Sequence, residues 1–260
     1  MTGPALHVTR VPQQLEWQAA GPGGEPAGTV RAWLRPDQRC SVFFDSARPE
    51  AYPLLAAAVA GELGCDLYAT VDESDAAQLA ACAAAGFTLS RRESYYLIPT
   101  SPAQTGLAAS ALPAGLTVLS ASGADEDRLR LLDDELRQDV PGSDGWRWDA
   151  EGFRRETFSP AFDPATYLVA VEEGSGEYAG LVRVWNNPAG PRLGLIAVRD
   201  GYRRRGLARA LLGRTLGVLS ERGQAAVTAE VDDTNNASRT LLAGLGARRT
   251  GGCAELVRRR

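Results

Sequence analysis

Three consecutive arginines, Arg203–Arg205, stand directly before Gly206 and the start of a helical apolar repeat. The first N–H groups of a helix have no partners inside the helix and carry the positive end of its dipole. A glycine lets an anion approach the main chain, and the arginines add positive charge around it. The turn could therefore bind a phosphate group, although a run of arginines is also typical of a solvated surface.

The segments on both sides of this turn have predictable structure. Leu193–Val198 is apolar and too short for a helix, which predicts a buried strand. From Leu207 the apolar period is helical, and Gly223 is placed to end that helix. The turn lacks the Gly-Lys-Ser/Thr of a P-loop and the three glycines of a dinucleotide fingerprint, so both of these motifs are excluded.

A second strand and helix follow in the sequence. Ala225–Val231 is apolar and predicts a strand, and Asn236–Leu245 predicts a short helix that ends at Gly246. Asn235, Ser238 and Leu242 are spaced three and four residues apart, which puts them along one face of that helix.

These segments together resemble the GNAT acetyltransferase superfamily. The pyrophosphate motif of that family, Arg/Gln-x-x-Gly-x-Gly/Ala, matches Arg203–Ala208 between the expected strand and helix. A later family motif, Asn-x-x-Ser/Ala-x-x-x-Tyr-x-x-x-Gly-Phe, matches at Asn235, Ser238 and Gly246. The two motifs in this order are more specific than either one alone.

The resemblance implies direct transfer of an acetyl group from acetyl-coenzyme A to an amine. It implies that the main chain at Ala197 and Val198 bonds the pantetheine arm and polarises the thioester carbonyl. Asn235 would meet the pantetheine arm, with Ser238 as a further cofactor-binding position. The implied pyrophosphate-binding residues are Arg203, Arg204, Arg205, Gly206, Leu207 and Ala208.

The sequence departs from the family at Leu242 and at Ala247, where tyrosine and phenylalanine are usual. In the family the tyrosine usually protonates the departing thiolate, and leucine cannot do this. A free thiol has a pKa of about 8.5, so the thiolate is a tolerable leaving group at neutral pH. Water or Ser238 could also replace the missing acid.

An amine nucleophile must lose a proton, so a carboxylate or a water relay is required near its path. Glu230 is the first candidate for this base, because a glutamate inside an otherwise apolar strand needs a reason. The alternative is a surface or ion-paired role for the same side chain.

The acceptor side of the site is expected in a loop between two predicted helices, Asp125–Asp139 and Ala150–Phe158. In GNAT-like folds this helix pair and its loop usually form one wall of the acceptor site. Tryptophan rings and carboxylates in the loop could hold a cation, or the tryptophans could simply pack the loop onto the sheet. The candidate substrate residues are Trp146, Trp148, Asp144 and Asp149.

The order of predicted elements in the N-terminal part repeats that of the C-terminal part, which indicates an internal duplication. Val71–Asp75 corresponds to Val231–Asn235, but no Arg-x-x-Gly-x-Gly/Ala pattern follows the strand Cys40–Asp45. We therefore predict an α/β (α+β) protein with two GNAT-like domains, each with a mixed, mostly antiparallel sheet flanked by helices. The predicted parts are a degenerate, shortened domain at 1–98, a linker at 99–113 and an acetyl-CoA-binding domain at 114–260. The first domain is expected to be structural rather than a second active site.

The composition narrows the class of protein. The chain has 260 residues and a net charge of −4, which argues against a general nucleic-acid binder. It contains no lysine, which excludes lysine Schiff-base chemistry. No apolar run is long enough to cross a membrane, and the four cysteines show no metal-binding pattern, so we expect a cytoplasmic protein without a metal. Two hypotheses remain: an N-acetyltransferase for a small-molecule or peptide amine, and a non-catalytic acyl-CoA-binding sensor or interaction protein.

Overall fold

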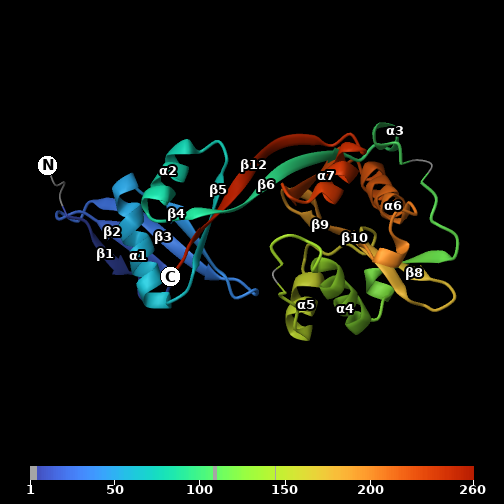
Figure 1. The fold of residues 1–260 in the computed structure, drawn as a ribbon, viewed down its shortest axis with the longest axis horizontal. Helices are drawn as coiled ribbons and strands as arrows, with labels where there is room; N and C mark the ends of the chain where they lie inside the picture. The colour runs from blue at the N-terminus through green and yellow to red at the C-terminus, as the bar shows by residue number, and fades with distance from the viewer. Residues whose placement is uncertain (1–4, 108–109, 144) are drawn as a thin grey trace. The chain divides into compact units, whose positions relative to one another are not determined.

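The computed structural model describes residues 5–107, 110–143 and 145–260. The chain divides into two compact units (Figure 1). The first unit contains Met1–Glu93 and Gly251–Arg260, and the second contains Ser94–Thr250. The long strands β6 (Thr88–Pro99) and β12 (Arg248–Arg258) are therefore each divided between the units.

The first unit is a sheet packed against two helices. Its strand order is β1-β2-β3-β4-β5-β12, antiparallel except for the parallel pair β4–β5. Trp17, Leu55 and Leu67 are fully buried in its core. The elements are β1 (His7–Arg10), β2 (Glu16–Ala20), β3 (Pro26–Leu34), β4 (Cys40–Asp45), α1 (Tyr52–Leu63), β5 (Leu67–Asp72) and α2 (Ala76–Ala84).

The second unit has a sheet with helices on both faces. Its strand order is β7-β8-β9-β10-β11-β6, and the pair β10–β11 is parallel. The strands are β7 (Leu116–Ser120), β8 (Tyr167–Glu172), β9 (Tyr178–Asn187), β10 (Gly190–Val198) and β11 (Ala226–Asp232). The helices are α3 (Pro102–Thr105), α4 (Glu126–Arg137), α5 (Ala150–Thr157), α6 (Leu207–Glu221) and α7 (Asn236–Ala243).

Alternation along the strands builds two separate apolar layers in this unit. Val182, Val184 and Val198 pack with α6 and α7 on one face, whereas Leu181 and Leu195 pack with α4 and α5 on the other. In Figure 1 the helices α6 and α7 accordingly lie on one side of β9 and β10, and α4 and α5 lie on the other. The prediction of a mixed sheet flanked by helices is confirmed.

The boundaries of the compact units differ from the simple division of the sequence at 98 and 114. The C-terminal half of β12 pairs with β5, from Cys253↔Asp72 to Arg258↔Leu67, and so completes the sheet of the first unit. In the second unit β6 lies next to β11. Strand β6 is a single long strand between β12 and β11.

The segment predicted to be a linker is partly folded. It contains the short helix α3, and Leu107 is buried in the core beneath α6. A Cβ on Gly213 would stand 3.3 Å from the carbonyl oxygen of Leu107, so glycine permits this close approach. The buried side chain of Leu107 thus anchors part of the segment 99–113, whose composition predicted a linker.

Candidate functional site

The basic turn has the backbone geometry that an anion site requires. Gly206 is the N-cap of α6, with φ of +87°, and a Cβ at this position would meet nothing within 4 Å. Arg204 also has a positive φ of +59°, which is rare outside glycine and is concentrated at functional sites. The N-terminal N–H groups of α6 are therefore presented beside an open approach.

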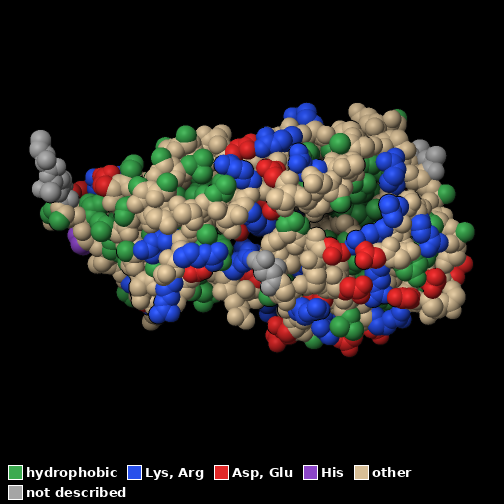
Figure 2. All heavy atoms as spheres, viewed as in Figure 1, with side chains coloured by type: hydrophobic (Ala, Val, Ile, Leu, Met, Phe, Trp, Pro, Cys, Tyr) green, Lys and Arg blue, Asp and Glu red, His purple; other side chains and the backbone are tan. Residues whose placement is uncertain are grey.

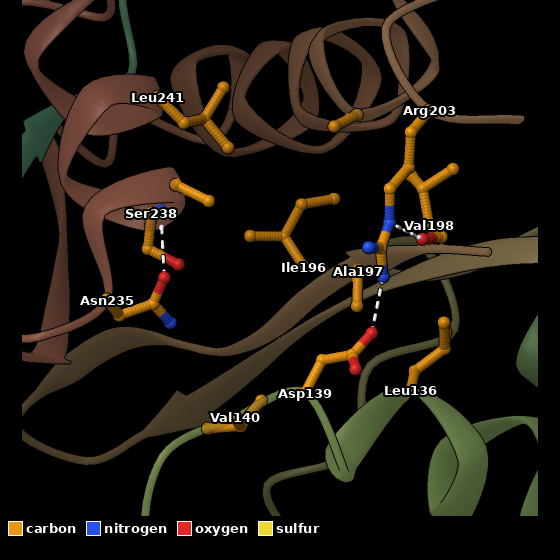
Figure 3. A pocket seen from close by; sticks show the side chains of 12 residues that line it. Leu136, Asp139, Val140, Ile196, Ala197, Val198, Arg203, Asn235, Ser238 and Leu241 are labelled. Atoms are coloured by element: carbon orange, nitrogen blue, oxygen red, sulfur yellow. Dashed lines mark hydrogen bonds and ion pairs between the residues drawn. The ribbon is translucent and has the colours of Figure 1, made fainter. Parts of the chain in front are cut away.

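Two cavities meet at this turn. One, of about 330 Å³, is lined by the residues of the turn, including Arg204, Gly206 and Arg209. The other, of about 420 Å³, lies between the end of β10 and α7 (Figure 3). The residues common to both cavities are Val198, Arg203 and Ala208. An elongated ligand with a charged part and an uncharged part could therefore lie along both.

The larger cavity lies where β10 and β11 diverge. Among the described residues these two strands are in register only at Arg192↔Thr228 and Leu193↔Ala229. On its other edge β10 stays paired with β9 as far as Val198. The main chain of Ile196, Ala197 and Val198 thus has one edge without a strand partner, and this edge can bond an extended ligand.

The start of α7 forms the opposite wall of the larger cavity. Asn235 is the N-cap of α7, and its Oδ1 accepts a hydrogen bond of 3.0 Å from the N–H of Ser238 (Figure 3). The side-chain amide of Asn235 remains able to donate to a ligand. Leu241 lines the cavity, whereas Leu242 is 2% exposed and belongs to the apolar core.

Six residues of this cavity were not predicted from the sequence. Ile196, Ala237 and Leu241 are close in sequence to predicted site residues, and the other three are Leu136, Asp139 and Val140. These three lie at the C-terminal end of α4 and just beyond it. Leu136 follows the ordinary apolar spacing of its helix, and nothing in the local pattern distinguishes Asp139 from a solvated carboxylate.

Glu230 forms an ion pair outside the larger cavity. Its carboxylate accepts two hydrogen bonds from the guanidinium group of Arg192, of 3.2 and 2.7 Å. Both side chains are partly exposed to solvent. The ion-paired alternative thus describes Glu230 in this structure, and the residue is absent from the described lining of the cavity.

The tryptophan loop is held by side chains of α4. The indole N–H of Trp148 donates to the buried carboxylate of Asp133, and the main-chain N–H of Trp148 donates to Asp134 at 2.9 Å. The guanidinium of Arg137 lies 5.8 Å from the ring centroids of both Trp146 and Trp148. A cation of the protein itself therefore occupies these ring faces, which favours the packing interpretation.

The two acidic residues proposed with these tryptophans have different outcomes. Asp149 is the N-cap of α5, and its Oδ1 accepts a hydrogen bond of 2.7 Å from the N–H of Gly152. Asp144 lies outside the described residues. Asp149 thus has a structural partner and is not a free carboxylate.

Burial in the protein disfavours the charged form of the carboxylates of α4. Burial raises the pKa of Asp134, and the hydrogen bond from Trp148 only partly opposes this shift. Asp133 is fully buried and is neutralised by Arg137 and by the buried Arg183. Figure 2 shows basic and acidic side chains intermixed over the region of α4 and α5, without a patch of a single sign.

The first unit repeats the divergence of strands but not the anion turn. Strands β4 and β5 are in register only at Cys40↔Leu67 and Ser41↔Tyr68 among the described residues. Beyond this point the ring of Phe44 stacks on Tyr52 at the start of α1, with 4.3 Å between centroids. Aromatic packing thus stands where the second unit has its cavity.

The capping of the helix that follows is the same in both units. Asp75 caps α2 with its side chain as Asn235 caps α7, and Asp72 binds Ser74 as Asp232 binds Thr234. These matching contacts agree with the internal duplication predicted from the sequence.

Two further searches of the described residues concern other classes of function. They contain no cluster of three or more His, Cys, Asp or Glu side chains placed to hold a metal ion. In the same residues no helix is long and apolar enough to cross a membrane.

The diverging parallel strands β10 and β11, the N-terminal turn of α6 and the capped start of α7 together form one candidate site. The acetyltransferase (GNAT) family matches residues 129–247. This match lies within the second compact unit.

A relative, the mycothiol acetyltransferase of Thermobispora bispora, is 32% identical over 200 residues. The match covers 74% of this chain and 65% of the relative's length.

Solved structures share the fold over nearly the whole chain. A GCN5-related N-acetyltransferase from Sphaerobacter thermophilus has a TM-score of 0.73 at 21% identity, covering 95% of this chain and 81% of that one. A tandem GNAT protein from the clavulanic acid biosynthesis pathway has a TM-score of 0.67 at 18% identity, covering 98% of this chain and 84% of that one. The predicted tandem arrangement is thus confirmed at the level of fold.

The GNAT family uses acetyl-CoA as its acetyl donor, and the residues present fit this molecule. The pyrophosphate is matched by the glycine turn and by Arg204 and Arg209, which line the smaller cavity. The pantetheine arm is matched by the free edge of β10 and by the mostly apolar cavity beside it.

Proposed function

We propose that the chain is an N-acetyltransferase that moves an acetyl group from acetyl-CoA to the primary amine of a small molecule or peptide. The observation that carries this proposal is the pair of adjoining cavities at the turn of α6 and the diverging ends of β10 and β11. Charged groups line the first cavity and a free strand edge lines the second, as the two parts of the donor require.

Different residues of the second unit would bind different parts of the donor. The N–H groups of the turn Arg203–Ala208 hold the pyrophosphate, and the main chain at Ala197 and Val198 bonds the pantetheine arm. The side-chain amide of Asn235 donates to the same arm, with Ser238 beside it. When bound, the donor supplies a thioester carbonyl that the amine can attack.

Glu230 remains our proposed general base, acting directly or through water. It lies one residue beyond Ala229, the last described position of β11 in register with β10. At this point the strands begin to separate. In the absence of substrate its carboxylate is held by Arg192, and an ammonium group of the acceptor would compete for it.

The proposal specifies the acceptor only by its chemical class, which is a primary amine. The relative from Thermobispora bispora is a mycothiol acetyltransferase. An acceptor amine of such an enzyme therefore belongs in a panel of test substrates. Polyamines, aminoglycosides, amino acids and peptides complete the panel. A cytoplasmic location is part of the same proposal.

Thiol release from acetyl-CoA across this panel, together with coenzyme A binding by calorimetry, tests the function. In Gly206→Glu the new side chain strains a positive φ and places a carboxylate against the pyrophosphate. We expect coenzyme A affinity to fall by at least about 30-fold and turnover to be lost. Gly217→Glu, on the same helix with open space around it, is the matched control and should bind normally. Equal binding by both variants would refute the donor site.

The burial of Leu242 favours a second candidate function, a non-catalytic acyl-CoA-binding protein. Leu242 has no proton to donate to the thiolate, and its side chain is packed in the core rather than in the cavity. Tight coenzyme A binding without thiol release for any amine would support this candidate over the enzyme.

A further inference from the structure

One guanidinium group lies where the two cavities of the proposed donor site join. Arg203 lines both of them. Its Nε donates a hydrogen bond of 2.8 Å to the carbonyl oxygen of Val198, which holds the guanidinium group against the end of β10. A donor that extends from the turn to the strand edge must pass this side chain.

Both remaining ends of this guanidinium are paired with carboxylates. One nitrogen binds Asp139, and the other lies 2.5 Å from the Oδ1 of Asp200. The two carboxylates differ in position. Asp139 lines the larger cavity and is 63% exposed, whereas Asp200 is absent from the described lining and is 87% exposed. Figure 3 shows Arg203 descending from the turn and Asp139 rising from beyond α4 to meet it.

The pyrophosphate of the donor and Asp139 therefore need the same cation. A guanidinium binds phosphate well because its planar N–H groups match two oxygens at once. It cannot bind a phosphate with a nitrogen already given to a carboxylate. In addition, Asp139 places a negative charge next to the path of a negatively charged ligand.

We infer that Asp139 is a donor-site residue that competes with the pyrophosphate of coenzyme A for Arg203 and so weakens donor and product binding. Pyrophosphate binding breaks the Asp139–Arg203 pair, and re-formation of the pair helps coenzyme A to leave. This inference rests on the proposed function of the site. It adds a residue that sets the affinity for coenzyme A without touching the acetyl group.

A neighbouring ion pair provides a matched control. Glu135, on the last turn of α4, binds Arg199 at 2.6 Å, four residues before the Asp139–Arg203 pair in both segments. Neither Glu135 nor Arg199 belongs to the described lining of the two cavities. Glu135→Gln thus removes the same charge and the same kind of contact without freeing a donor-site cation.

The experiment is coenzyme A binding by calorimetry in a double-mutant cycle of Asp139→Asn and Arg203→Gln. Asp139→Asn should tighten binding about two- to fivefold, the range expected for release of a partly exposed ion pair. Its dissociation rate, measured by stopped flow, should fall by a similar factor. In the Arg203→Gln background the same change should bring no gain, and Glu135→Gln should bring none in the wild-type background.

Each other outcome overturns the inference. An equal gain in both backgrounds would show simple charge repulsion rather than competition for Arg203. An equal gain in Glu135→Gln would show a general charge effect. No gain, or weaker binding, would show that Asp139 holds the turn ready for the donor. If wild type failed to bind coenzyme A at all, the proposed function itself would fall, which is a distinguishable result.

Discussion

Leu242 illustrates how a sequence motif and a packed core can give different information about one position. The motif aligns Leu242 with the tyrosine of the family, which suggests that tyrosine could restore a missing acid. The structure buries this side chain in the core beneath α6 and α7, with 2% exposure. The neighbouring Leu241 is the one that lines the cavity.

Leu242→Tyr should therefore destabilise the second unit rather than restore catalysis. Overpacking of a filled core costs about 1–3 kcal/mol, and the tyrosine hydroxyl would also need a partner. Urea unfolding followed by circular dichroism measures this loss. Leu241→Tyr is the control, because it should fill the cavity and weaken coenzyme A binding while changing stability less. Higher turnover of Leu242→Tyr at unchanged stability would contradict the prediction.

Glu230→Gln tests the proposed base. Loss of a general base lowers turnover by about 10²–10⁴-fold, while coenzyme A affinity should stay unchanged. Removing a partly exposed ion pair costs only about 0.2–1 kcal/mol of stability, so misfolding would not explain such a loss. A variant with full turnover would leave Glu230 as a side chain that ties β11 to Arg192 of β10.

Most residues of the proposed donor site are candidates from the sequence alone, because the signal for them is local. The strand, Gly206 and the start of α6 are contiguous, so one stretch of residues specifies the turn. The Asn235 cap is equally local, since its partner is Ser238. Asp139 could not be predicted, because its partner Arg203 is distant in sequence and only the folded unit brings them together.

Helix α4 shows at the level of an element how buried charge fixes a loop. Leu129 and Leu136 define its apolar face, and Asp133 lies on the same face by its spacing. The structure buries Asp133 completely. That its acceptor is the indole of Trp148 follows only from the structure, because the loop folds back onto its own helix.

Asp134 makes a prediction about pH. Because burial raises its pKa in the folded state, the folded protein keeps a proton that the unfolded chain loses near pH 3.9. Stability therefore falls as pH rises from this value through the higher folded pKa. Asp134→Asn removes this loss and can still accept from the N–H of Trp148. The variant should gain stability relative to wild type between pH 4 and pH 7, as measured by urea unfolding.

The adjacent Asp133→Asn is the contrasting control. Removal of one partner from a buried ion network costs about 3–5 kcal/mol, because Arg137 and Arg183 would lose their counter-charge. This loss should appear at pH 7. The opposite result would be a loss of stability in Asp134→Asn that is larger at pH 7 than at pH 4. It would show that burial does not have the effect assigned to it.

At the scale of the whole molecule, the fold class and the tandem arrangement were predictable from the sequence. The division of β6 and β12 between the two compact units was not. Strand periodicity identifies β6 and β12 but does not specify their partners, which lie far away in sequence. Consequently, the sequence-based boundaries assigned all of β12 to the second half, whereas its residues from Gly251 onward belong to the first compact unit.

Deletion of residues 251–260 should unfold the first unit. It removes the strand paired with β5, including Glu255, whose buried carboxylate is bound by Arg91 at 3.1 Å. Hydrogen exchange measured by mass spectrometry should show loss of protection in β1–β5, while coenzyme A binding by the second unit persists. Deletion of residues 259–260 alone, which leaves β12 intact, is the control. Unchanged protection of β1–β5 would contradict the prediction.

The position of β12 also has a consequence during synthesis. The first 93 residues leave the ribosome early, but residues 253–258 must follow before β5 is fully paired. At about 5–20 residues per second, the nascent first unit waits roughly ten to thirty seconds with an open sheet edge. Such an edge is a template for wrong pairing between nascent chains. Slow translation of the second unit should therefore increase aggregation of the first.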